Sequence, residues 1–288
     1  MIGDELKEYL KHRKDGFFEF EEKAKISSSV KFNVDKLQLP SGKVGFIKEI
    51  YGAGNGESDC MVCAEVLLSR LYQKLGLKSI EYYPVINNGH RCVISESYEG
   101  ENISLGSDFF DKVMSNTADF GLLCLNERII KFCDEYNRSD LNTIQNFLRF
   151  ADVDFFRQLF IVRGLDVGTF NYDRNFKNFF VESDASGIAK NMILLDNEAS
   201  GCMVYKRNGY HNDFTSQKLF EDDLIRAFKQ NEDYQQYITR FEIAETIATA
   251  PFEETAHEIK EEMGFVVEHE FLETMKANSN NIAEELVK

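Results

Sequence analysis

A short polar segment in the second half of the sequence contains residue types that could transfer a phosphoryl group. Asp173 is followed five residues later by Asn178, and Asp196 comes at the end of a later apolar run. One carboxylate could accept the proton of an attacking hydroxyl, while an amide oxygen and a second carboxylate could hold Mg²⁺ against phosphate oxygens. Because D-x-x-x-x-N is also common in ordinary turns, its meaning depends on the elements around it.

The elements that flank this segment predict how the three side chains are brought together. A strongly apolar, amphipathic stretch over 147–162 comes first and is typical of a buried helix. Two apolar runs follow at 179–181 and 192–195, separated by a polar stretch, and we predict that they form a hairpin. Asn178 and Asp196 would then stand at the two ends of the hairpin, within reach of the same metal ions.

A lysine interrupts an otherwise apolar strand pattern over 44–50. Lys48 would lose hydration there unless it faces solvent or finds a partner. One interpretation is an exposed edge strand. The other is that Lys48 faces a cleft, contacts ATP phosphates and pairs with Glu65, which lies in a predicted helix ending near Leu75. In the first interpretation Glu65 is an ordinary exposed helix residue.

The remaining pattern predicts an α+β protein in two parts. Alternation over 28–34 and the run over 44–50 indicate an antiparallel pair, and two more strands are expected at 80–86 and 91–97. Beyond Gly100 the pattern is mostly helical apart from the hairpin. We therefore predict a small part over 1–98, a larger helical part over 99–288, and a cleft between them.

The composition narrows the classes of partner and compartment. The chain of 288 residues has 49 acidic and 33 basic residues, a formal charge of −16 and a pI near 4.8. Such a surface repels polyanions, so neither nucleic acid nor an anionic membrane is the expected partner. The N-terminus lacks the apolar core of a signal peptide, and we expect a cytoplasmic protein, with a secreted effector as the open alternative. The pair Cys60 and Cys63 is expected to be two buried helix thiols.

Several of these segments resemble the HipA-like serine/threonine kinases, relatives of the phosphoinositide-kinase branch of the protein-kinase-like superfamily. The resemblance covers roughly 44–197. It rests on Lys48 in its strand, on the helix over 64–76 with its early Glu and its closing Leu-Gly, on the loop over 171–178, and on Leu-Leu-Asp at 194–196. It implies a bilobal kinase-like fold, with an antiparallel sheet and one helix in the small lobe and a catalytic hairpin in the large lobe.

The family loop usually reads N-x-D-R-H-x-x-N. This chain matches it at Asn171, Asp173, Arg174 and Asn178 but has Asn175 where His is usual. The departure affects the packing of the loop and removes neither the base nor the metal ligand that the family would use.

The resemblance implies a role for each matching residue. Asp173 would be the catalytic base, Asn178 and Asp196 the Mg²⁺ ligands, and Lys48, paired with Glu65, a contact of the ATP phosphates. The hinge over 93–97, represented by Val93 and Glu96, would hold adenine through backbone groups. Ser28, in the serine run at 27–29, would belong to a phosphate-contacting turn, whose alternative is a plain turn.

Three classes of function stay open at this stage. The first is an ATP- and Mg²⁺-dependent protein serine/threonine kinase, acting on an unidentified protein and restrained, as some relatives are, by an antitoxin-like or other regulatory partner. The second is a small-molecule phosphotransferase of the aminoglycoside or choline kinase type, although those usually carry His-Gly-Asp ahead of the loop. The third is a pseudokinase scaffold, which would not need Lys48, Asp173, Asn178 and Asp196 together.

Overall fold

The computed structural model describes 10, 13–14, 17–19, 25–29, 34–38, 43–50, 55–98, 100–115, 149–171, 174, 176–205 and 238–288. Within these residues the helices are α2 (Asn55–Lys74), α3 (Gly106–Ser115), α6 (Val153–Gly168), α7 (Glu198–Tyr205), α9 (Arg240–Ala248), α10 (Phe252–Met263) and α11 (His269–Val287). None of the helices described combines the length and the apolar character needed to cross a membrane.

The first sheet has the strand order β1-β2-β7-β8-β5-β4-β3. Its members are β1 (Arg13–Lys14), β2 (Phe17–Glu19), β3 (Lys25–Ser29), β4 (Val34–Gln38), β5 (Val44–Glu49), β7 (Tyr83–Asn87) and β8 (His90–Glu96). All of its neighbours pair antiparallel except β2 and β7, which are parallel. Turn residues join β7 to β8, where Asn88 and Gly89 both have positive φ.

The second sheet has the order β6-β11-β10-β9 and contains the predicted hairpin. Strands β10 (Phe179–Ser183) and β11 (Ala189–Leu194) pair antiparallel, with Phe179 opposite Leu194. The short β9 (Ile103–Leu105) adds to β10, and β6 (Lys78–Ser79) adds to β11 in parallel. Because β6 follows α2 directly, the N-terminal part of the chain contributes a strand to the sheet that holds the hairpin.

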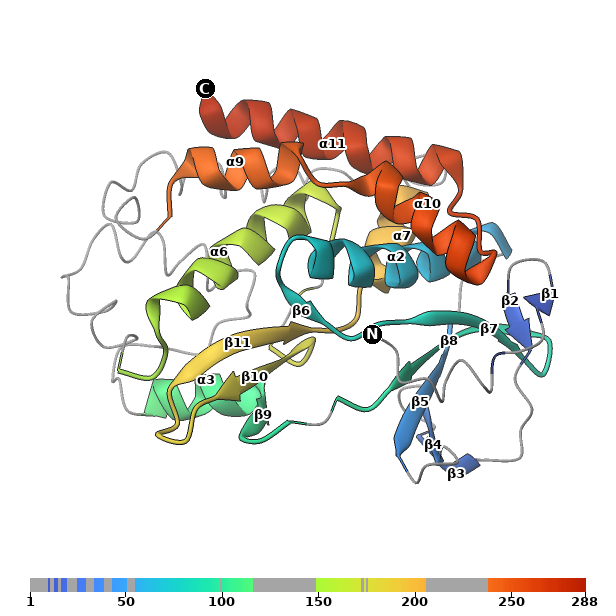
Figure 1. Cartoon of the computed structure of the whole chain (residues 1–288), viewed down its shortest axis with the longest axis horizontal. Helices are drawn as coiled ribbons and strands as arrows, with labels where there is room; N and C mark the ends of the chain where they lie inside the picture. The colour runs from blue at the N-terminus through green and yellow to red at the C-terminus, as the bar shows by residue number, and fades with distance from the viewer. Residues whose placement is uncertain are drawn as a thin grey trace.

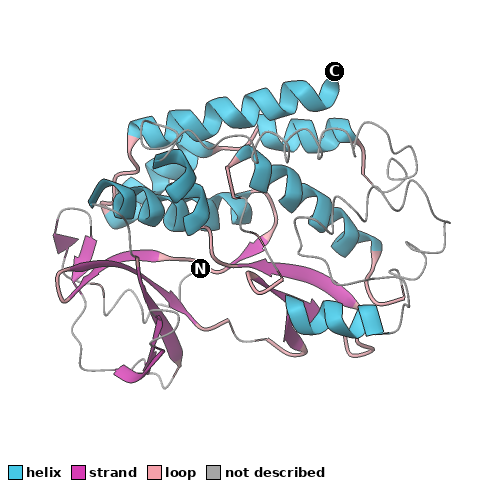
Figure 2. Cartoon of the chain, turned by 180° about the vertical axis from the view of Figure 1, so that it is seen from behind, coloured by secondary structure: helices cyan, strands magenta, loops and turns pink. Residues whose placement is uncertain are grey.

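The helices gather on one side of the two sheets, and α3 alone among those described lies at the opposite side (Figures 1 and 2). Helix α2 lies between the first sheet and the C-terminal helices, and its residues 62–68 are almost completely buried. Asp152 caps α6 by accepting the backbone N–H of Phe155 at 2.8 Å. Gly264 ends α10 with the left-handed φ of 70° that suits glycine.

The structure confirms the α+β class, the hairpin and the buried helix thiols Cys60 and Cys63. It corrects three details. The first sheet is mixed, because the N-terminal β2 pairs parallel to β7. The predicted strand over 80–86 begins at Tyr83, since β6 takes the chain to the other sheet first. Ser28 lies inside β3, opposite Asp35, and so does not precede the first strand as a turn.

Helices α2 and α7 approach so closely that one residue between them has to be glycine. A Cβ at Gly201 would overlap the carbonyl oxygen of Cys60 and lie 2.5 Å from the Cα of Met61. Both obstacles are backbone atoms, which cannot rotate away. Gly201 therefore sets the distance between α7, which starts at Glu198, and α2, which carries Glu65.

Gly201→Ala is expected to push α7 away from α2 and to destabilise the protein by about 1–3 kcal/mol, as overpacking does. It should also weaken binding of the ATP and Mg²⁺ that the resemblance implies, because α2 carries Glu65, the expected partner of Lys48. Gly164→Ala is the matched control: its Cβ would meet the side chain of Ile243, between α6 and α9. Equal loss of nucleotide binding in the two variants, measured by calorimetry on folded protein, would contradict a specific role for the α2–α7 contact.

Candidate active site

Lys48 lies at the centre of a cluster of three carboxylates. Its Nζ is 3.1 Å from Glu65 Oε1, 3.0 Å from Asp196 Oδ1 and 3.0 Å from Glu198 Oε2. Burial alone would lower the pKa of the ammonium, but the three carboxylates together raise it above its ordinary value. Lys48 is therefore a permanent cation that faces a carboxylate cluster, and the exposed edge-strand interpretation is wrong.

Glu65 joins α2 to the loop that follows the hairpin. Its Oε1 accepts from Lys48, and its Oε2 accepts the backbone N–H of Asn197 at 2.7 Å. The Glu65 side chain is completely buried, and this burial raises its pKa to about 7, with Lys48 opposing the shift. The predicted partnership of Lys48 with Glu65 is thus present as a contact, and the exposed-helix alternative for Glu65 does not hold.

A buried arginine holds the two ends of the hairpin together. The guanidinium of Arg174 donates to the backbone carbonyls of Asn178 and Leu195 and to the side chain of Asn197. It also forms a fully buried ion pair with Asp166, at 3.1 Å. Because one planar group satisfies both hairpin ends, it fixes the segment around Asn178 against the segment around Asp196.

The ion pair behind this arginine reaches back to α2. Asp166 lies near the C-terminal end of α6 and also accepts the Tyr72 hydroxyl at 3.2 Å. Burial raises the pKa of the Asp166 carboxyl, and Arg174 opposes that shift. The network therefore links α2, α6 and both hairpin ends through charged and polar groups that water does not reach.

The backbone is in the left-handed region at two places beside this network. Phe170, just before the loop, has a φ of 61°, and Asp196 has a φ of 58°. The conformation is costly for a bulky residue such as Phe and less so for Asp. At Asp196 the backbone N–H also donates to the Tyr82 hydroxyl at 3.4 Å. Strain that the surroundings hold in place is typical of functional segments.

The described part of the loop over 171–178 is tightly packed. Asn171 is completely buried, and neither its amide nitrogen nor its amide oxygen has a hydrogen-bond partner among the residues described. Asn178 is almost buried, and its carbonyl oxygen accepts the N–H of Leu195 at 3.1 Å. The expected base, Asp173, lies outside the described residues, as does Asn175, so their roles stay predictions.

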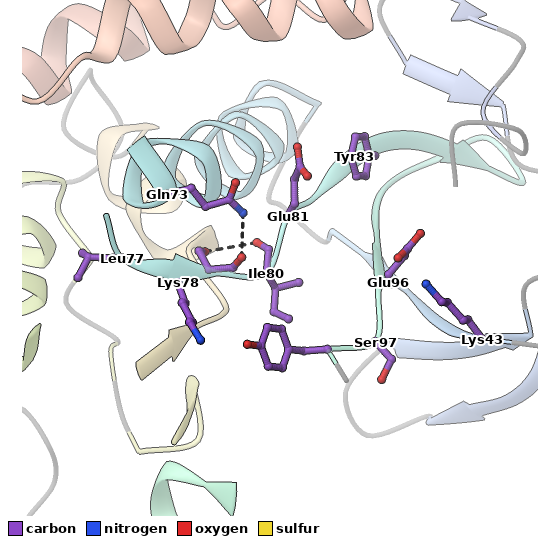
Figure 3. A pocket seen from close by; sticks show the side chains of 11 residues that line it. Lys43, Gln73, Leu77, Lys78, Ile80, Glu81, Tyr83, Glu96 and Ser97 are labelled. Atoms are coloured by element: carbon purple, nitrogen blue, oxygen red, sulfur yellow. Dashed lines mark hydrogen bonds between the residues drawn. The ribbon is translucent and has the colours of Figure 1, made fainter. Parts of the chain in front are cut away.

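The residues expected to hold adenine occupy different positions in β8. Val93 is buried and sits opposite Lys48 in the β5–β8 ladder, so its backbone groups belong to the sheet. Glu96 is the last residue of β8, where the chain leaves the first sheet toward β9. Its backbone stays a predicted nucleotide contact, while its side chain lines a separate cavity (Figure 3). Ser28 is placed only as a β3 residue.

The carboxylate cluster is suited to a hard divalent cation. Oxygen atoms of Glu65, Asp196 and Glu198 lie within 4.8 Å of one another. Asp196 and Glu198 are partly open to solvent, with side chains 36% and 30% exposed, whereas Glu65 is closed off. Lys48 compensates one of three negative charges. Carboxylates of this kind fit Mg²⁺, and Asp196 with Asn178 would be the ligands that the sequence predicts.

Sequence reasoning missed three contributors to this site. Glu198 was not singled out, although it stands two residues after Asp196 and caps the cluster from the first turn of α7. Asp166 and Tyr72 were not recognised as the support of Arg174. Only the closely spaced acidic residues at 196 and 198 gave a signal in the sequence, because Tyr72 is 94 residues from Asp166 and nothing in the local pattern marks Asp166 as the partner of Arg174.

No family model matches this chain, and no curated protein matches it. Solved structures do resemble it. The Helicobacter pylori proinflammatory kinase CtkA is 14% identical over 92% of this chain and 99% of its own, with a TM-score of 0.39.

Two further structures extend the comparison. A chain of the Shewanella oneidensis complex of HipA, HipB and operator DNA is 13% identical over 93% of this chain and 68% of its own, with a TM-score of 0.35. An aminoglycoside phosphotransferase from Alicyclobacillus acidocaldarius is 12% identical over 92% of this chain and 90% of its own, with a TM-score of 0.27. At this level of identity, function has to be inferred from the side chains of the site itself.

Proposed function

We propose that this chain is an ATP- and Mg²⁺-dependent phosphotransferase that passes the γ-phosphoryl group to a hydroxyl, as a serine/threonine kinase of the HipA-like type. The observation that carries the proposal is Lys48, held at 3.1 Å from Glu65 and 3.0 Å from Asp196. A lysine that bridges a helix glutamate and a carboxylate after the catalytic hairpin is the arrangement that kinases use to hold phosphates and metal.

The chain's own residues would divide the work as follows. Lys48 neutralises phosphate charge, and Glu65 holds the ammonium in place from α2. Asp196 and Asn178 would hold Mg²⁺, which supplies charge stabilisation at the transferring phosphoryl group. Asp173 would orient the acceptor hydroxyl and take its proton. Arg174 positions the segment between these ligands without touching the substrate, through its bonds to both hairpin ends.

The small-molecule phosphotransferase remains the second candidate enzyme, since the same centre serves either acceptor. A scaffold is less well supported, because it gains nothing from a buried glutamate whose pKa is raised and whose partner is a largely buried lysine. The proposed partners are ATP, a protein substrate and a regulatory protein of the antitoxin kind. Labelled ATP incubated with the protein, with a lysate and with aminoglycosides or choline would identify the acceptor class.

Asp173→Ala provides the direct test of the reaction. The variant is expected to keep its affinity for ATP and to lose phosphoryl transfer by about two orders of magnitude or more, as loss of a general base does. Asp111→Ala, an exposed aspartate on α3, is the matched control and should transfer normally. Transfer within about threefold of wild type would exclude Asp173 from the mechanism.

A further inference from the structure

A cavity of about 620 Å³ opens beside the end of β8, away from the carboxylate cluster. Its walls come from the end of α2, from the segment that carries β6 and leads to β7, and from the turn after β8 (Figure 3). Gln73, Glu81, Glu96 and Tyr98 are among the side chains that surround it. The volume is within the range of sites that enclose small ligands.

The strand register places this cavity on the opposite side of the first sheet from Lys48. Residues directly opposite each other in a ladder share a face, and successive residues alternate. Lys48 pairs with Val93, whereas Glu96 pairs with Gly45 and therefore projects from the other face. Tyr83 pairs with Ile94 and shares that other face. The cavity is therefore distinct from the space into which Lys48 points.

The charged groups around the cavity are paired with one notable exception. Arg70 bonds Glu81 at 2.6 Å and Glu262 at 2.7 Å, and Lys78 bonds Glu182 at 2.5 Å, so each of these carboxylates already has a cationic partner. The Oε1 atom of Glu96 is buried and has no hydrogen-bond partner in the structure described. A buried carboxylate oxygen without a donor is costly, and a ligand that brings a charged N–H group would remove that cost.

We propose that this cavity binds a ligand with a protonated nitrogen, an ammonium or a guanidinium, which donates to Glu96. Tyr98 also lines this space, and an aromatic ring attracts a cation that lies over its face. The formal charge of −16 favours approach of cations over long distance. The exposed Lys43 lies at the rim, and its positive charge repels a cationic ligand and so lowers the affinity. The ligand could be a free amine or the basic side chain of a peptide.

The test compares a guanidinium with a neutral group of the same shape. Binding of N-acetyl-arginine amide and of N-acetyl-citrulline amide to the full chain would be measured by calorimetry, without nucleotide. The arginine compound is expected to bind at least about tenfold more tightly, because a charge-assisted hydrogen bond to a carboxylate is lost with citrulline. Agmatine and a Gly-Gly-Arg-Gly-Gly peptide then distinguish a free amine from a peptide as the source.

Variants locate the site. Glu96→Gln should weaken binding of the arginine compound by about tenfold or more, and Lys43→Gln should strengthen it. Lys48→Met should leave it within about twofold, so failure of this proposal is separate from failure of the phosphotransferase proposal. Equal binding of the citrulline compound, no saturation at about 10 mM, or displacement by ATP with Mg²⁺ would each overturn the proposal. If Glu96→Gln fails to fold, the arginine–citrulline comparison on the wild-type chain decides alone.

Discussion

Lys48→Met is expected to reduce turnover by about three orders of magnitude, or about 4 kcal/mol in the barrier. Methionine fills similar space but cannot neutralise phosphate charge, and electrostatic stabilisation is most of what a kinase supplies. Labelled-ATP transfer would measure the loss. Lys260→Met, on the exposed face of α10, is the matched control and should retain full activity. A folded Lys48→Met protein with full activity would mean that another residue contacts the phosphates.

The structure also predicts how the stability of Lys48→Met depends on pH. Burial already raises the pKa of Glu65 to about 7, and loss of the Lys48 charge raises it further. A carboxyl whose folded pKa exceeds its unfolded value contributes stability below the unfolded value of about 4.5, and loses it as pH rises through the folded pKa. Wild type loses this stability up to about pH 7 and the variant continues to lose it above that pH, so the melting temperature of the variant should fall relative to wild type as pH rises above about 7.

A double variant tests whether Lys48 and Glu65 act as one unit. With Glu65→Gln added, the pH-dependent loss should disappear, because no buried carboxyl remains to be ionised. Turnover should fall little beyond that of Lys48→Met, since the two residues act as a unit. Two independent losses that multiply would show that Glu65 has a role apart from holding Lys48.

Asp196→Asn is expected to abolish the Mg²⁺-dependent part of nucleotide binding while the fold is retained. An amide is a poorer ligand than a carboxylate for a hard dication. Asn tolerates the left-handed φ of 58° that position 196 requires, so the backbone there can stay as it is. The measurement is the rise in melting temperature with ATP and Mg²⁺, compared with ATP and a chelator. An unchanged Mg²⁺-dependent rise would exclude Asp196 as a ligand.

Two controls make the result for Asp196 specific. Asp111→Asn removes one charge from an exposed position on α3 and should leave the Mg²⁺ response unchanged. Glu198→Gln removes one negative charge beside Lys48, since the carboxylate of Glu198 also lies 3.0 Å from the Lys48 ammonium. Equal losses in Asp196→Asn and Glu198→Gln would show that both carboxylates contribute to metal binding, and that Asp196 has no special role.

The sequence by itself determined those parts of the site that depend on local pattern. Short apolar runs bounded by polar segments predicted the strand around Lys48 and the hairpin, and helical periodicity predicted the helix with Glu65. A hairpin brings its two ends together whatever the rest of the fold does, and for that reason the proximity of Asn178 and Asp196 could be predicted.

Tertiary structure decided the features that depend on segments far apart in the chain. Whether Lys48 points outward or pairs with carboxylates could be decided only with the position of Asp196, which is 148 residues away. Arg174 contacts Asp166 on α6 and the ring of Tyr72 on α2. Gly201 has to be glycine only because the backbone of α2 packs against it. Periodicity tells which face of an element is buried but not which residues lie against that face. The chemistry of this site depends on those residues.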